Sequence, residues 1–171
     1  KPKRELDQFI ATTKTSAAKA LLAKIKGLAD DANIAFVGDD DFVSLAMERL
    51  ELGKATFTVF DIDAELLEQI RSKSIKGIQT IQHDCRVALP NLYRDQFNLV
   101  ITDPPYTSNG VKLFLNRALE LLGKADVNDN KYIILYYGNS FKTSEKTLKI
   151  QEIISDMKLL IEDKIDKFAR Y

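Results

Sequence analysis

Apolar residues along the chain follow two different spacings. Five short runs are rich in apolar, β-branched and aromatic residues, which predicts strands buried in a sheet. They are NIAFV (33–37), ATFTVF (55–60), GIQTIQ (77–82), FNLVIT (97–102) and KYIILYY (131–137). A sixth run, LLIEDKI (159–165), predicts one more strand near the end of the chain.

Outside these runs, apolar residues recur every three or four positions, which is typical of amphipathic helices. The stripes are Ala18, Leu21, Leu22 and Ile25; Val43, Ala46, Met47 and Leu50; Val111, Phe114, Leu115, Ala118, Leu119 and Leu122; and Ile150, Ile153, Ile154 and Met157. A helix followed by strand–helix units predicts an α/β fold, with a doubly wound, mainly parallel sheet and helices on both faces.

The length of the chain is suited to one domain with a sizeable core. We expect 1–30 to form an N-terminal segment and helix, and 31–171 to form the sheet core. The chain starts at Lys1 rather than Met and ends at Tyr171, before a seventh strand could follow the sixth. We therefore expect a fragment of a longer protein whose sheet lacks its last strand.

Composition excludes several classes of protein. The 25 basic and 25 acidic side chains cancel, so the chain lacks the basic excess of a protein that holds nucleic acid through phosphates, and we expect no such partner. No apolar run approaches the roughly 18 residues of a membrane-spanning helix. The single cysteine, Cys85, cannot form an internal disulfide, which favours a reducing, cytoplasmic location. Whether the protein forms a homodimer is left open.

Acidic residues follow four of the predicted strands, directly after each strand ends. The segments are Gly38-Asp39-Asp40-Asp41, Asp61-Ile62-Asp63, His83-Asp84 and Asp103-Pro104-Pro105-Tyr106. The carboxyl ends of parallel strands meet at one edge of a sheet, where α/β proteins bind their ligands. The pattern therefore predicts a shared site of the kind that binds a nucleoside.

Each acid also has a simpler interpretation. Asp41 is equally well placed to cap a helix that starts near Phe42. Asp63 is expected to cap the next helix, which leaves Asp61 as the ligand for ribose hydroxyls. Asp84 on its own could be an ordinary loop residue, because aspartate is common in turns.

The segment DPPY (103–106) is the most specific motif. Two prolines fix the backbone and remove two amide donors, so the turn offers carbonyl oxygens as acceptors. A carboxylate on one side and an aromatic ring on the other could hold an amine. Asp103, the Pro104 carbonyl and Tyr106 are therefore candidates for binding an amino group.

The motif resembles the (N/D)PP(Y/F) turn of class I methyltransferases that modify amino groups of nucleobases. These enzymes bind S-adenosylmethionine at the same strand ends, and QFIATTKTSAAKAL (8–21) resembles the segment before their first strand. A closer resemblance is to the branched-chain polyamine synthases, the N(4)-bis(aminopropyl)spermidine synthases. It rests on RELDQF (4–9), GDDD (38–41), DID (61–63), HD (83–84) and DPPYT (103–107), in this order. Thr13 departs from the proline expected there, and the winged-helix-like N-terminal region of the family is absent from the sequence.

This resemblance implies a class I methyltransferase-like Rossmann fold and an aminopropyltransferase. Such an enzyme moves an aminopropyl group from decarboxylated S-adenosylmethionine to a spermidine-like polyamine and releases methylthioadenosine, with no metal. The triple aspartate fits this chemistry. Asp39 and Asp40 would repel the carboxylate of S-adenosylmethionine by up to about 4 kcal/mol, whereas the decarboxylated donor and a polyamine are cationic.

The resemblance also implies roles for residues. Asp39 and Asp40 are expected to hold ammonium groups, with one of them accepting a proton, and Asp41 to bind the polyamine. Asp103, Pro104 and Tyr106 would orient the reacting amine and wall the site. The donor would be bound by Gln8, Gly38, Asp39, Asp61, Ile62, Asp84, Asp103 and Pro104, with Asp84 accepting from the adenine amino group and Asp7 beside Gln8.

Two other functions stay open. A methyltransferase would use S-adenosylmethionine to modify an exocyclic amino group of RNA or DNA, with Tyr106 stacked on an extruded base. The triple aspartate and the missing GxG pattern are arguments against a methyltransferase. A non-catalytic polyamine or nucleoside sensor is the third option. We expect His83 to be a solvated neighbour of the site rather than a base, and Cys85 to be a packed residue.

Overall fold

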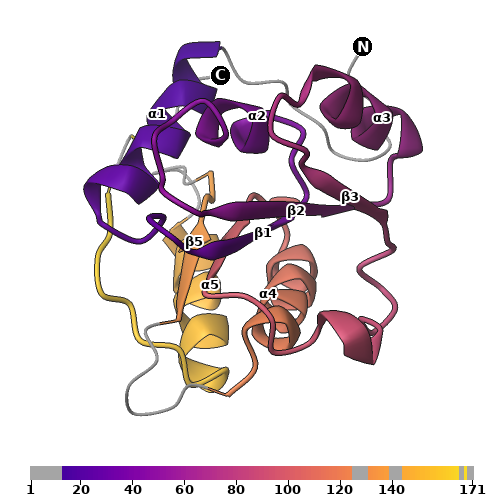
Figure 1. Cartoon of the computed structure of the whole chain (residues 1–171). Helices are drawn as coiled ribbons and strands as arrows, with labels where there is room; N and C mark the ends of the chain where they lie inside the picture. The colour runs from indigo at the N-terminus through magenta and orange to yellow at the C-terminus, as the bar shows by residue number, and fades with distance from the viewer. Residues whose placement is uncertain (1–12, 125–130, 139–143, 166–167, 169–171) are drawn as a thin grey trace.

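The computed structural model of the chain describes residues 13–124, 131–138, 144–165 and 168. Five strands within them form one sheet, whose spatial order is β3-β2-β1-β4-β5 (Figure 1). The strands are β1 (Asn33–Val37), β2 (Thr56–Asp61), β3 (Gln79–Gln82), β4 (Leu99–Thr102) and β5 (Tyr132–Leu135). Every neighbouring pair is parallel. The α/β fold and the first five predicted strands are therefore confirmed.

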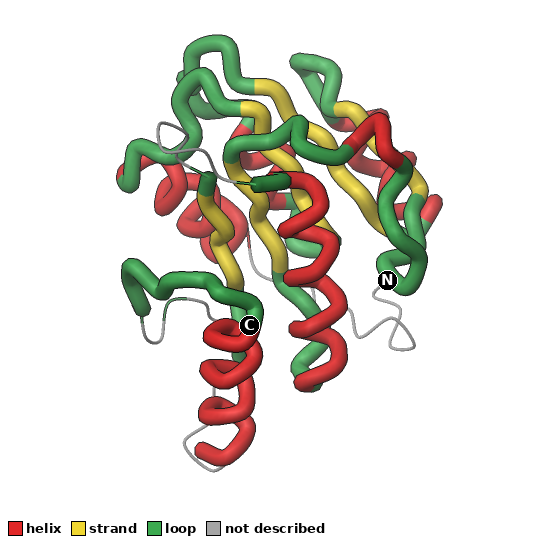
Figure 2. Tube along the Cα trace, turned by 90° about the horizontal axis from the view of Figure 1, so that it is seen from below, coloured by secondary structure: helices red, strands yellow, loops and turns green. Residues whose placement is uncertain are grey.

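Helices cover both faces of this sheet (Figure 1). They are α1 (Thr13–Ile25), α2 (Val43–Met47) and α3 (Ala64–Lys73) on one face, and α4 (Ser108–Leu122) and α5 (Ser144–Asp156) on the other. A short 3-10 helix, η2 (Asn91–Tyr93), precedes β4. Figure 2 shows the second face from below, with α4 in front of the strands.

Strand β1 illustrates why the sheet is apolar on both sides. Ile34 and Phe36 pack among residues of α1, α2 and α3, whereas Ala35 and Val37 belong to the core on the side of α4. Successive side chains of a strand point to opposite faces. A central strand covered twice therefore consists of apolar residues without alternation.

The face that α1 buries differs from the prediction. Leu21 and Ile25, which belong to the predicted apolar stripe, are 44% and 79% exposed. The buried face of α1 consists of Thr15, Ser16, Lys19, Ala20 and Ala23. Leu22 of the predicted stripe is partly buried against this core, but most of the buried face consists of small side chains, which let the helix lie close to its neighbours.

The prediction of a sixth strand at 159–165 is wrong. Residues 159–165 are described and form no strand. Leu160 is 85% exposed, and Lys26 pairs with Asp163, which holds the segment near the end of α1 instead of beside the sheet. An apolar run becomes a strand only where a neighbouring strand can satisfy its backbone hydrogen bonds.

No helix in the described part of the chain is both long enough and apolar enough to cross a membrane.

Candidate active site

The carboxyl ends of β1 and β4 lie side by side at the centre of the sheet. Val37 is opposite Thr102, and the Thr102 hydroxyl donates to the Val37 carbonyl at 2.8 Å. The chain order of the strands reverses between β1 and β4, and such a switch point is where open α/β sheets bind ligands. The segments that begin at Gly38 and Asp103 therefore leave the sheet at one place.

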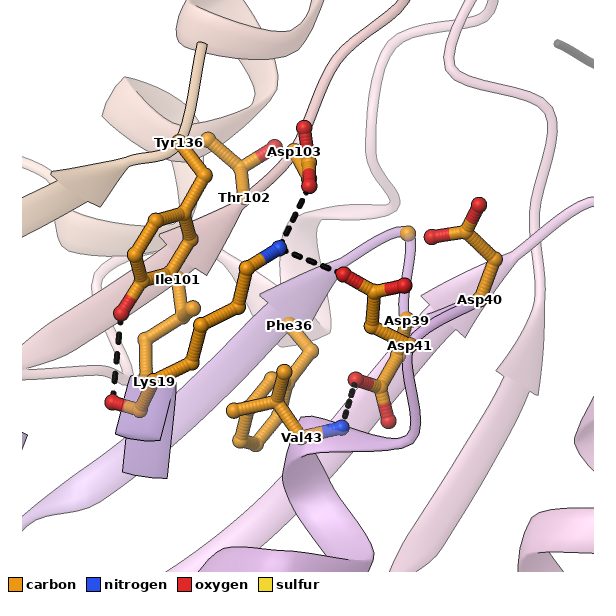
Figure 3. Close-up of a pocket in the computed structure, with 11 residues that line it drawn as sticks. Lys19, Phe36, Asp39, Asp40, Asp41, Val43, Ile101, Thr102, Asp103 and Tyr136 are labelled. Atoms are coloured by element: carbon orange, nitrogen blue, oxygen red, sulfur yellow. Dashed lines mark hydrogen bonds and ion pairs between the residues drawn. The ribbon is translucent and has the colours of Figure 1, made fainter. Parts of the chain in front are cut away.

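A pocket opens at this point (Figure 3). Its lining combines an apolar floor with a cluster of charged groups. The residues are Lys19, Phe36, Gly38, Asp39, Asp40, Asp41, Val43, Ile101, Thr102, Asp103 and Tyr136.

Gly38 is the turn residue at the end of β1. Its φ is +75°, a left-handed backbone that favours glycine, and its amide donates to the Phe60 carbonyl at 2.9 Å. A Cβ here would lie 3.4 Å from the Phe114 ring. Glycine therefore lets the chain turn sharply over the end of the sheet and leads directly into the three aspartates.

Asp39 holds the start of α2. Its side chain is 4% exposed and accepts from the Val43 amide at 2.7 Å, the Ser44 amide at 3.2 Å and the Ser44 hydroxyl at 2.5 Å. The sequence left open a capping role for Asp41, but Asp39 is the residue that bonds to these amides. Burial raises the pKa of Asp39 to about 8, although the hydrogen bonds from Ser44 and Val43 oppose the shift.

The raised pKa of Asp39 predicts a pH dependence of stability. Its ordinary pKa is 3.8, so between about pH 4 and 8 the folded state holds a proton that the unfolded state has lost. The free energy of unfolding is then expected to fall as pH rises through this window, by up to about 1.4 kcal/mol per pH unit.

Urea denaturation of Asp39→Asn at pH 5, 6 and 7 tests this expectation. Asparagine does not titrate, so the slope should flatten relative to the wild type. Asp61→Asn is measured in the same way, because burial also raises the pKa of Asp61 and this residue therefore contributes to the same slope. An unchanged slope in Asp39→Asn would show that Asp39 is ionised throughout this range.

Lys19 lies at the centre of the pocket, and the sequence analysis missed it. Its Nζ lies 2.5 Å from Oδ2 of Asp41 and 2.6 Å from Oδ2 of Asp103, so it joins the ends of β1 and β4 from helix α1 (Figure 3). Its side chain is 1% exposed. The Tyr136 ring centroid lies 4.4 Å from Nζ, and the Tyr136 hydroxyl donates to the Lys19 carbonyl at 3.2 Å.

Lys19 stays an ammonium ion in this setting. Burial acts to lower its pKa, but the carboxylates of Asp103 and Asp41 outweigh burial and raise the pKa. Two carboxylates and one ammonium leave one negative charge on the cluster. One sequence signal could have located Lys19: it shares a helical face with Thr15, Ser16, Ala20 and Ala23, a stripe of small residues that can pack closely.

The predicted ribose ligand, Asp61, is the last residue of β2, and the loop after the strand starts at Ile62. The Asp61 carboxylate accepts from the Asp63 amide at 2.8 Å, and burial raises its pKa while that bond opposes the shift. Asp63 caps α3 by accepting from the amides of Glu65 and Leu66, as predicted. Ile62 is 40% exposed at the tip of this loop.

The predicted adenine ligand, Asp84, is engaged by its own neighbour. Both carboxylate oxygens contact Arg86, with a closest distance of 2.6 Å, and these hydrogen bonds lower the pKa of Asp84 to about 2. The His83 Nε2 atom lies 3.0 Å from the Val87 carbonyl. Cys85 packs beside the core on the side of α4, where burial raises the pKa of its thiol to about 12.

The DPPY turn splits between the pocket and its surroundings. Asp103 lines the pocket, and Pro104 is buried. Tyr106 is not among the described residues of the lining. It packs edge-to-face on Tyr137 with ring centroids 5.5 Å apart, and a Cβ on Gly138 would lie 2.9 Å from its ring.

The structure thus brings together some of the predicted site residues and not others. The pocket gathers Gly38, Asp39, Asp40, Asp41 and Asp103. Asp61 ends β2, and Asp84 lies in the loop that follows the adjacent strand β3, on the same edge of the sheet. Asp7 and Gln8 lie outside the described residues.

Comparison with known proteins adds a family to this geometry. The family model of the branched-chain polyamine synthase A C-terminal domain matches residues 1–171. Among curated proteins, an uncharacterized protein from Methanocaldococcus jannaschii is 38% identical, with 97% of this chain and 41% of that protein covered. The N(4)-bis(aminopropyl)spermidine synthase of the same organism is 32% identical, with 99% and 49% covered. The chain therefore spans less than half the length of these relatives.

Solved structures support the same fold. A branched-chain polyamine synthase from Thermus thermophilus, in complex with N4-aminopropylspermidine and 5'-methylthioadenosine, has a TM-score of 0.65 and 27% identity, covering 71% of this chain and 36% of that one. A candidate RNA methyltransferase from Pyrococcus horikoshii has a TM-score of 0.58 at 19% identity, covering 71% and 62%. At that identity the second match shows only that the sheet and its helices are methyltransferase-like.

Proposed function

This chain belongs to the branched-chain polyamine synthase A C-terminal domain family, and on that premise we propose that it transfers an aminopropyl group from decarboxylated S-adenosylmethionine to an amine of a spermidine-like polyamine. Methylthioadenosine is the second product. The relative from Thermus thermophilus, whose structure contains an aminopropylated spermidine and methylthioadenosine, supports this choice of donor and acceptor.

The charge balance of the pocket is the observation that carries the proposal. Among the described residues that line the pocket, Asp40, Asp41 and Asp103 supply three carboxylates and Lys19 supplies one ammonium. With its side chain 1% exposed and within 2.6 Å of two carboxylates, Lys19 is poorly placed to accept the carboxylate of S-adenosylmethionine. The site is therefore suited to cations.

The geometry also favours a division of roles among the predicted residues. Asp103 would accept a hydrogen bond from the reacting amine, because it is the more exposed of the two carboxylates that contact Lys19, at 17% against 3%. Asp40 would hold an ammonium group at the mouth of the pocket. Asp39 would contribute mainly by fixing the turn, since its carboxyl already bonds to the start of α2.

The neighbouring strands would hold the nucleoside part of the donor. Asp61 would bind the ribose hydroxyls, with Gly38 and Ile62 shaping the surface beside them. Asp84 would accept from the adenine amino group while sharing its oxygens with Arg86. Pro104 would add its carbonyl, Tyr106 would wall the acceptor side beyond the pocket, and Gln8 would contribute to binding the donor.

Calorimetric binding of the two donors tests the proposal. Decarboxylated S-adenosylmethionine is expected to bind at least tenfold more tightly than S-adenosylmethionine, because Asp40 and its neighbours repel the extra carboxylate. Asp40→Asn should narrow this ratio severalfold. The matched control is Asp30→Asn, an exposed aspartate in the loop before β1, at the opposite edge of the sheet.

Equal or tighter binding of S-adenosylmethionine by the wild type would contradict aminopropyl transfer. The methyltransferase-like fold would then direct assays to exocyclic amino groups of RNA and DNA. Nucleoside binding without turnover of either donor would instead indicate a sensor.

A further inference from the structure

We propose that Lys19 is a positioning residue that sets the protonation state of the acceptor amine, acting through Asp103. The inference rests on the proposed aminopropyl transfer and deepens it. Lys19 is contributed by helix α1, outside the strand-end motifs, and yet its ammonium lies between the two segments that follow β1 and β4 (Figure 3).

The arrangement of this cluster gives each member a different access to the pocket. Lys19 and Asp41 are buried, with side chains 1% and 3% exposed, whereas the side chain of Asp103 is 17% exposed. The Ser16 hydroxyl donates to the Asp41 carbonyl at 2.6 Å, which fixes that turn against α1. A ligand in the pocket would therefore meet the Lys19–Asp41 pair through the carboxylate of Asp103.

The proposed reaction needs a neutral amine. The nitrogen lone pair forms a bond to the methylene carbon next to the sulfonium, and the carbon–sulfur bond breaks with its electron pair passing to sulfur. The nitrogen becomes cationic and then releases a proton to solvent. An amine that is still protonated has no lone pair, so a proton must leave the acceptor before the bond forms.

A carboxylate without a counter-ion would hinder the loss of this proton from the acceptor amine. An opposite charge within about 4–6 Å stabilises the charged form of an amine and raises its pKa by about 1–3 units. The Lys19 ammonium, 2.6 Å from Asp103, offsets this effect. Asp103 can then accept an N–H hydrogen bond and orient the amine without holding it as an ammonium ion.

Within the described part of the chain, the other titratable groups that line the pocket are Asp39, Asp40, Asp41 and Tyr136. Burial raises the pKa of the Tyr136 hydroxyl, which keeps it neutral. Burial raises the pKa of Asp39 to about 8, so most of its carboxyl groups have lost their proton at pH 9. Asp40 and Asp41 are present in both the wild type and Lys19→Met, so the comparison of these two proteins changes only Lys19.

The dependence of kcat on pH tests the proposal, because its limbs report groups in the enzyme–substrate complex. In Lys19→Met we expect the acidic limb to move to higher pH by about one unit, measured as methylthioadenosine release with spermidine as acceptor. Lys19→Arg keeps the charge and should keep the profile. Lys19→Met/Asp41→Asn removes one carboxylate together with the ammonium, so it should restore the wild-type midpoint.

A lower rate with an unmoved profile in Lys19→Met would overturn the inference and leave Lys19 a structural residue. Absence of turnover in the wild type would contradict aminopropyl transfer itself. The number of protons released when spermidine binds would then test the role of Lys19. Calorimetry of spermidine binding at pH 9, in two buffers of different ionisation enthalpy, should show about one proton released by the wild type and fewer by Lys19→Met. Equal release, or no binding by either protein, would overturn the role of Lys19.

Discussion

Replacing Asp103 with asparagine is expected to lower kcat/KM for aminopropyl transfer about 10²-fold while the fold is retained. The reacting nitrogen gains positive charge as its new bond forms, and a preorganised carboxylate next to it stabilises that charge. Removing one such group from a partly dry site costs on the order of 10²–10³ in rate. The asparagine carbonyl can still accept from Lys19, which lies 2.6 Å from the present carboxylate.

The measurement is methylthioadenosine release at saturating and limiting spermidine, compared with Asp30→Asn as a surface control. Thermal unfolding of both variants separates lost catalysis from lost structure. If Asp103→Asn retains activity within about threefold of the wild type, then Asp103 does not contact the reacting amine, and the role assigned to the DPPY turn fails.

Replacing Lys19 with methionine is expected to lower the free energy of unfolding by about 3 kcal/mol at pH 8. Removing one member of a buried ion pair leaves charges without compensation and costs about 3–5 kcal/mol, and here Asp41 is 3% exposed.

Urea denaturation at pH 8 measures this effect. Lys14→Met, an exposed lysine near the start of the same helix, is the matched control and should stay within about 0.5 kcal/mol of the wild type. Lys19→Met/Asp41→Asn should regain part of the stability, because it removes one of the two carboxylates that pair with Lys19 in the wild type. A loss in Lys19→Met no larger than that in Lys14→Met would mean that the ion pairs contribute nothing to the folded state.

The pattern of the sequence determined the sheet and the edge on which the site lies. Strand β1 occupies the predicted range, and β2 is displaced by a single residue. These predictions succeed because a strand buried on both faces requires a local run of apolar residues, and because parallel strands must end at a common edge. The sequence alone therefore predicts that the acids after β1 and β4 lie close together.

Tertiary structure alone decided how each of those acids is used. Asp39 bonds to the start of α2, Asp41 pairs with Lys19 across 22 positions of sequence, and Asp103 pairs with the same lysine across 84. Burial and pairing depend on which elements meet in space, and a single sequence gives no record of those contacts. The same cause explains two wrong predictions, the leucine face of α1 and the strand at 159–165, because an apolar pattern shows what a segment could bury and its neighbours determine what it does bury.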